Sequence, residues 1–157
     1  MCGRYVAKRG LDDLAAEFEA EDMVSPSSRR STGTDALGPA LAPDYNVAPT
    51  DPVPVVVLRH RSGERGGGQV RQLRAAKWGL VPSWASDTSR AAKLINARAE
   101  TVTELPAFRS AVRRRRCLVP ADGWYEWAPR PDGAGRQPTY LTPLSGEVVA
   151  FAGLYEI

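Results

Sequence analysis

The chain contains no long hydrophobic run, and this absence excludes a helix that crosses a membrane. No apolar stretch in its 157 residues approaches the roughly 20 residues that a bilayer span needs. The N-terminus also lacks the apolar core of a secretory signal, because Arg4, Lys8 and Arg9 are cationic. We therefore expect a cytoplasmic protein without a membrane partner.

Cysteine and histidine are scarce. The two cysteines, Cys2 and Cys117, lie far apart in the sequence, which fits a reducing compartment better than a disulfide framework. Together with the single histidine, His60, they offer few soft ligands for zinc, so we expect no metal ion and no other cofactor. We also expect Cys117 to be a buried, inert thiol, and His60, in a charged hairpin loop, to be an ordinary exposed side chain.

The sequence shows neither an internal repeat nor an interdomain linker, so we expect one domain over residues 1–157, in a monomer. A hydrophobic content of 43% and a charged content of 25% are typical of a globular protein with a core. The net charge of +3 is uneven, because residues 113–116 are four consecutive arginines. Such a run is more often a solvated face than a binding site, so by itself it favours a polyanion partner only modestly.

Hydrophobic periodicity predicts a short amphipathic helix and several strands. Residues 11–18 have apolar side chains at helical spacing, with two aspartates in the first turn. Four apolar runs are typical of strands, the first two forming a hairpin: residues 54–59, 69–73, 117–119 and 148–154. We expect residues 99–112 to be partly helical and residues 25–43, rich in Ser, Thr, Gly and Pro, to form a flexible surface loop. Helices and strands do not alternate, which favours an α+β fold over a doubly wound sheet.

Cys2 becomes the first residue once Met1 is removed, and an N-terminal cysteine is a 1,2-aminothiol. Its α-amine, with a pKa of about 7.7–8.0, and its thiol, with a pKa of about 8.5, are both accessible nucleophiles near neutral pH. Aldehydes are the matching electrophiles, because the amine forms an imine and the neighbouring thiolate then closes a five-membered thiazolidine. On position alone, however, Cys2 is better explained as an incidental residue near a frayed chain end, so the function of Cys2 depends on the rest of the sequence.

Four further segments mix polar and aromatic groups beyond what packing requires: residues 45–50 (YNVAPT), 78–84 (WGLVPSW), 96–101 (NARAET) and 121–127 (ADGWYEW). With the Cys2-Gly3-Arg4 start and residues 116–120 (RCLVP), they resemble the SOS response associated peptidase (SRAP) family, whose members process abasic sites in DNA. The resemblance covers nearly the whole chain. It implies a strand-rich mixed or antiparallel sheet with a partly barrel-like core and short peripheral helices.

The resemblance implies a chemistry that suits the aminothiol. An abasic site exposes a ring-opened deoxyribose aldehyde, and Cys2 would capture it as a covalent thiazolidine crosslink, after autoproteolytic or aminopeptidase removal of Met1. The implied activity is abasic-site crosslinking of a lyase type in DNA repair and the SOS response. The implied partner is single-stranded or junctional DNA, which would associate the protein with the nucleoid.

The same resemblance assigns two further catalytic residues. Glu126 matches the family's active-site glutamate and would act as the acid or base for the sugar oxygen or the imine. Asn96 matches the asparagine beside the N-terminal residue, where an amide can orient the amine or hold the sugar. Outside these motifs, a lone glutamate is more often an ordinary surface residue and an asparagine a turn or cap residue.

Six residues would hold the DNA by similarity. Arg4 and Arg98 resemble phosphate-contacting arginines, a role that suits the bidentate guanidinium. Trp84 and Trp127 offer faces on which unpaired bases can stack. Asn46 and Pro49 correspond to a loop that lines the DNA groove. For the other two tryptophans, Trp78 and Trp124, we expect core packing instead.

The chain departs from the family pattern in two places. Relatives continue past the position of Ile157 into a segment with an active-site histidine, so we expect this chain to be truncated and its turnover, more than its capture, to suffer. Relatives also often carry a tryptophan at the position of Ala85. Two other functions remain open: a cysteine-dependent peptidase that acts on proteins, and a non-catalytic module that binds single-stranded DNA.

Overall fold

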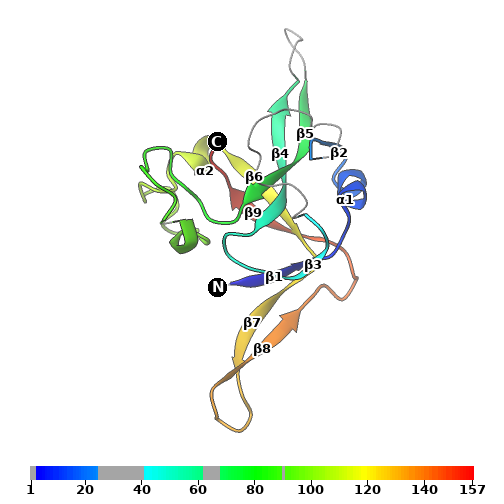
Figure 1. Cartoon of the computed structure of the whole chain (residues 1–157), viewed down its shortest axis with the longest axis vertical. Helices are drawn as coiled ribbons and strands as arrows, with labels where there is room; N and C mark the ends of the chain where they lie inside the picture. The colour runs from blue at the N-terminus through cyan, green and yellow to red at the C-terminus, as the bar shows by residue number, and fades with distance from the viewer. Residues whose placement is uncertain (1–2, 25–40, 62–67, 90) are drawn as a thin grey trace.

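The computed structural model describes residues 3–24, 41–61, 68–89 and 91–157, and it confirms the α+β class (Figure 1). Strands dominate, and the helices are short. The elements follow in this order: β1 (Arg4–Ala7), α1 (Leu11–Glu17), β2 (Ala20–Asp22), β3 (Asp44–Val47), β4 (Pro52–His60), β5 (Gln69–Lys77), the 3₁₀ helix η2 (Ala91–Lys93), α2 (Ala111–Arg114), β6 (Arg116–Ala121), β7 (Gly123–Pro129), β8 (Arg136–Leu141) and β9 (Val149–Leu154).

The strands form two sheets. The first, which we call sheet A, has the order β3-β1-β7-β8, and the second, sheet B, has the order β2-β5-β4-β6-β9. All pairings are antiparallel except the parallel pair of β2 and β5. The described strands leave both sheets open and form no closed barrel.

Sheet B contains the strands that the apolar runs predict. The hairpin of β4 and β5 is in register from Pro52 opposite Lys77 to His60 opposite Gln69. The later runs form β6 and β9, which pair along their full length. The valines of β4 are buried on both faces, since Val55 and Val57 face sheet A whereas Val56 packs against α1.

The predicted amphipathic helix is α1. Its Leu14 is buried against Val56 and Leu73, and Asp12 and Asp13 occupy its first turn, where a negative charge suits the helix dipole. The expected helical character of residues 99–112 is confirmed only at its end. There, turns with bonds such as Arg109 N–H to Leu105 O lead into α2.

The core between the sheets fixes β1 against sheet B. Tyr5 of β1 is 3% exposed and packs in one cluster with Val55, Val57 and Cys117. Its ring meets Trp78 and Phe151 edge to face, at centroid distances of 5.4 and 6.2 Å. Burial of a full aromatic side chain contributes about 1.5–3 kcal/mol, so these contacts hold the N-terminal strand firmly.

The two sheets are joined at Asp122, where β6 runs directly into β7 (Figure 1). The Asp122 carboxylate is buried and accepts hydrogen bonds from the Lys8 backbone N–H at 2.8 Å and from Arg9 Nε at 3.0 Å. The Asp122 backbone N–H donates to Val6 O at 2.8 Å. This corner therefore fixes β1 beside the first residues of β7.

Most of the loop expected over residues 25–43 lies outside the described residues, and its last part, residues 41–43, belongs to no helix or strand.

The expectation about membrane spans concerns the helices. Within the described part of the chain, no helix is both long and apolar enough to span a bilayer.

Candidate functional site

The start of β1 is the structural centre of the candidate site. Arg4 is its first residue and lies opposite Tyr125 of β7. Gly3 precedes Arg4 directly in the chain, and Glu126 follows Tyr125 directly on β7. Cys2, the expected nucleophile, lies outside the described residues.

Arg4 and Asn46 lie together. The Arg4 guanidinium donates from Nη1 to Asn46 Oδ1 at 3.3 Å, across the pairing of β1 with β3. Both side chains are on the part of sheet A nearest the N-terminus, and Asn46 is exposed. Two of the predicted DNA-binding residues are therefore direct neighbours.

Pro49 lies in a tight turn between β3 and β4. Asp51 closes the turn, because its carboxylate accepts from the Ala48 N–H at 2.8 Å and its own N–H donates to Ala48 O. Thr50 has φ of 77°, and its N–H donates to Trp78 O. The turn that carries Pro49 is thus fixed to Trp78.

Trp78 connects this turn to the segment that carries Asn96. Its indole Nε1–H donates to Ile95 O at 2.9 Å, and its ring packs on Tyr5 of β1. Gly79, with φ of 130°, lets the chain pass closely over Ala91, since a Cβ there would lie 2.5 Å from Ala91 O. Asn96 follows Ile95 directly, so contacts of Trp78 tie its segment to β1.

Glu126 and its neighbours alternate across β7. Trp124 is on the core side, where it packs edge to face on Phe151 at 5.8 Å, and this confirms the packing role expected for Trp124 and Trp78. Glu126 is two residues further along and half-buried, so alternation places it on the same side as Trp124. Tyr125 and Trp127 occupy the opposite face of sheet A.

The remaining predicted DNA-binding residues are exposed. Trp84 has 63% of its surface exposed and Trp127 has 42%, as stacking requires. Arg98 is also exposed and lies with Trp84 on the long connection from β5 to α2, whereas Trp127 lies on β7. The binding roles of these residues stay predictions.

Sequence reasoning missed two residues that organise this site. Asp122 holds β1 beside β7 through its buried carboxylate, and the signal for it was a charged residue between two apolar strands. Tyr125 links three strands of sheet A, since it lies opposite Arg4 and its hydroxyl donates to Tyr45 O at 3.1 Å. No local pattern indicated that contact.

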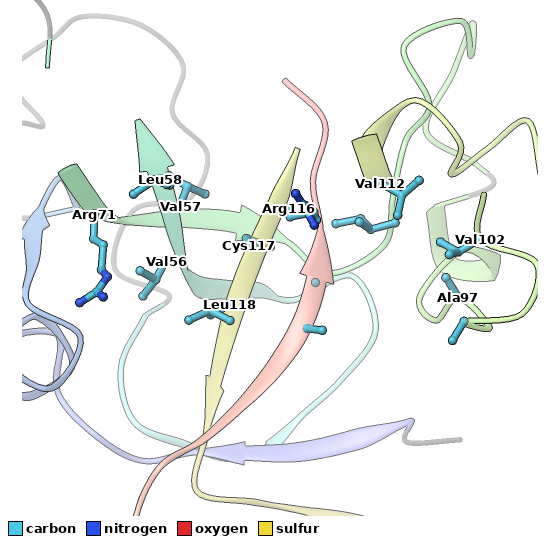
Figure 2. A pocket seen from close by; sticks show the side chains of 14 residues that line it. Val56, Val57, Leu58, Arg71, Ala97, Val102, Val112, Arg116, Cys117 and Leu118 are labelled. Carbon is cyan, nitrogen blue, oxygen red and sulfur yellow. The ribbon is translucent and has the colours of Figure 1, made fainter. Parts of the chain in front are cut away.

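The described residues form an apolar groove of about 600 Å³ on sheet B, away from the candidate site, shown in Figure 2. Leu58, Leu118 and Leu154 of three strands line it together with Val102 and Val112. Its one thiol, Cys117, is buried, and burial raises the pKa of that thiol to about 11. The expectation of an inert Cys117 is thereby confirmed, and the groove offers no nucleophile near neutral pH.

Metal ligands do not gather in the described part of the chain. Among residues 3–24, 41–61, 68–89 and 91–157, no three His, Cys, Asp or Glu side chains lie close enough to hold a metal ion. His60 is exposed, as expected, but it is the last residue of β4, opposite Gln69 of β5, and does not lie in the hairpin loop.

Comparison with known proteins identifies the same family that the motifs indicate. The family model described as SOS response associated peptidase (SRAP) matches residues 1–157. The abasic site processing protein YoaM of Bacillus subtilis is 35% identical over 156 residues, which cover 99% of this chain and 60% of the relative. The abasic site processing protein HMCES of Xenopus tropicalis is 30% identical over 146 residues, which cover 90% of this chain and 42% of the relative.

Solved structures show the same fold. A protein from Bacteroides thetaiotaomicron superposes with a TM-score of 0.70 at 23% identity, covering 98% of this chain and 59% of that one. The chain therefore spans about 60% of the length of YoaM and about the same share of this structural neighbour.

Proposed function

Because the chain belongs to the SOS response associated peptidase family, we propose that it processes abasic sites in DNA by capturing them covalently on Cys2. The relatives YoaM and HMCES are named abasic site processing proteins. On this proposal the partner is single-stranded or junctional DNA that contains an abasic site.

The proposed crosslinking reaction needs no cofactor. After Met1 is removed, the Cys2 amine attacks the aldehyde carbon of the ring-opened sugar, and the resulting carbinolamine loses one water molecule to give an imine. The Cys2 thiolate then adds to the imine carbon, and the imine nitrogen takes up a proton. One C–N and one C–S bond replace the carbonyl bond, and the thiazolidine is the product.

The single observation that carries this proposal is the pairing of β1 with β7. Arg4, the first residue of β1, lies opposite Tyr125, and the next residue of β7 is Glu126. Consecutive Cα atoms are only about 3.8 Å apart, so the chain connects Cys2 to this position. The register supports Glu126 as the group that protonates the leaving hydroxyl of the carbinolamine and takes the proton back afterwards.

The neighbouring residues suit the other tasks. The guanidinium of Arg4 can bind a phosphate beside the captured sugar, and Asn46 holds that guanidinium from one side. The Asn96 amide can hold the sugar or the amine without adding charge, on a segment that Trp78 ties to β1. Arg98, Trp84, Trp127 and Pro49 would then contact the flanking strand.

A denaturing gel with an abasic oligonucleotide tests the proposal. The wild-type protein should form a covalent band under reducing conditions, and Cys2→Ala should form none. Glu126→Gln should slow band formation by about 100-fold or more, because general acid–base catalysis contributes that much. Glu147→Gln removes an exposed carboxylate far along the chain and is the matched control.

The outcome separates this proposal from its alternatives. A band of undiminished intensity with Cys2→Ala would refute the assigned nucleophile. Salt-sensitive binding without any covalent band would indicate a non-catalytic DNA-binding module. Retention of Met1 in the intact mass of an inactive protein would mean that the amine is blocked and that the cysteine cannot act in this way.

A further inference from the structure

Trp78 is held in place by its backbone and by its ring. Its backbone N–H donates to Asp51 O at 2.9 Å, and its backbone oxygen accepts from the Thr50 N–H at 2.8 Å. Its ring meets the ring of Tyr5 edge to face, at a centroid distance of 5.4 Å. Because Tyr5 is only 3% exposed, the core between the sheets fixes the place of the indole.

The indole N–H of Trp78 reaches the segment that carries Asn96. It donates to Ile95 O at 2.9 Å, and Asn96 is the next residue along the chain. Beside this bond, the Leu80 N–H donates to Leu94 O at 3.0 Å. Asn96 itself lies in no helix or strand, so contacts of this kind determine where its backbone lies.

The hydrogen bond of Trp78 does more than pack the core. Trp124 in the same core makes a ring contact, edge to face on Phe151 at 5.8 Å. The indole N–H of Trp78 instead reaches a backbone oxygen 17 residues further along the chain. A buried indole N–H usually has a partner, and here that partner directly precedes a candidate catalytic residue. The bond therefore couples the core around β1 to a segment distant in the sequence.

We propose that Trp78 is a positioning residue for the covalent step. Its indole N–H holds the chain before Asn96, so that the Asn96 amide lies where it can orient the Cys2 amine or the sugar. This inference rests on the proposed function and extends it to a side chain that acts through another residue. A shift of an orienting group by about 1 Å can slow a reaction by about 100-fold. Loss of the N–H should therefore slow capture and leave DNA binding intact.

An isosteric analogue tests the N–H without changing the packing. 3-Benzothienylalanine has a sulfur atom in place of the ring N–H and can be placed at position 78 through an amber codon. With protein in excess over an abasic oligonucleotide, the maximal rate of covalent band formation should fall by about 10- to 100-fold. The protein concentration at half-maximal rate and the affinity for undamaged single-stranded DNA should change by less than about twofold. The same analogue at Trp124 is the matched control and should leave all three values unchanged.

A loss of stability alone would give a different result. A partly unfolded protein contains fewer binding-competent molecules, which raises the concentration at half-maximal rate and leaves the maximal rate unchanged. Trp78→Phe keeps an aromatic ring but has no N–H, so it repeats the measurement with a natural residue. Circular dichroism checks that each variant is folded.

A double-mutant cycle tests the route through Asn96. Asn96→Ala should slow capture, and addition of Trp78→Phe to it should slow capture no further. Multiplicative effects of the two substitutions would overturn the inference, and so would a wild-type maximal rate for the folded analogue protein. In both of those cases capture by Cys2 stands. If wild type crosslinks no abasic oligonucleotide, the proposed function fails, and this inference with it.

Discussion

At the scale of single residues, we expect the two cysteines of this chain to differ in reactivity. Cys117 is 7% exposed in the core, and burial disfavours its thiolate, so its pKa is raised to about 11. An N-terminal cysteine has no such constraint, and its thiol has a reference pKa of about 8.5. Sequence context was enough to predict the buried thiol of Cys117, because a cysteine inside an apolar strand is nearly always a packing residue.

Alkylation with iodoacetamide should therefore separate the two thiols. At pH 8 the folded protein should be labelled on Cys2 within minutes, while Cys117 should react far more slowly until the protein is unfolded in guanidinium chloride. Labelling of Cys117 in the folded protein should rise about tenfold per pH unit, because its thiolate fraction rises in that way below a pKa of about 11. Peptide masses identify the labelled residue. Equal labelling of both thiols at pH 8 would contradict the buried state of Cys117.

At the scale of elements, sequence patterns predicted the apolar strands and missed the strands that carry the candidate site. Sheet B strands such as β4 and β9 are runs of aliphatic residues, and α1 has clear helical periodicity. By contrast β1, β3, β7 and β8 are short or rich in polar and aromatic residues, so no period revealed them. Their pairing comes from the turn at Asp122 and from contacts distant in the sequence.

The stability of sheet A should depend strongly on the corner at Asp122, where β6 runs into β7. Asp122→Asn keeps the size but removes the charge that binds Arg9 and the Lys8 N–H, so it should lower the free energy of unfolding by about 1–3 kcal/mol. Asp132→Asn is the matched control, since Asp132 lies 3.9 Å from Arg130 at the surface and should change stability by under about 0.5 kcal/mol. Urea unfolding measures both. Equal effects of the two substitutions would contradict the role given to the corner.

Gly123 provides an independent test of the same corner. A Cβ at this position would lie 2.4 Å from Leu141 O and 2.5 Å from the Tyr140 hydroxyl, so Gly123→Ala must displace β8 from β7. We expect a loss of about 1–3 kcal/mol of stability, as for overpacked positions. Gly68→Ala, where no atom lies within 4 Å of the added Cβ, should leave the unfolding midpoint nearly unchanged. A midpoint for Gly123→Ala that matches Gly68→Ala would show that the strands are not so closely paired.

At the scale of the whole molecule, the sequence offered candidate site residues but could not predict which of them lie close together. Arg4 and Asn46 are direct neighbours, and Trp78 ties the segment of Asn96 to β1. Trp84 and Arg98 lie on the separate connection from β5 to α2. These relations depend on the pairing of strands that are far apart in the sequence, which local patterns do not encode.

The apolar groove on sheet B is another property of the whole molecule. Leu58 is 53% exposed and Leu118 is 38% exposed, and both line the groove in Figure 2. A contiguous apolar surface of this kind binds hydrophobic dyes. The fluorescence of anilinonaphthalene sulfonate should therefore rise on addition of the folded protein and fall several-fold with Leu118→Gln. Leu144→Gln, which removes a single exposed leucine elsewhere, should leave the signal unchanged, and an equal drop for both would show that the groove is not the dye site.

The proposed function depends most on which atom of the protein holds the damaged sugar, and one mass spectrum identifies that atom directly. The protein crosslinked to an abasic oligonucleotide is digested with nuclease and then with trypsin, which cleaves after Arg4. The account predicts that the peptide Cys2-Gly3-Arg4, without Met1, carries the remaining sugar with the loss of one water molecule. A sugar found instead on a lysine such as Lys8 or Lys93, or a peptide that still begins with Met1, would contradict it.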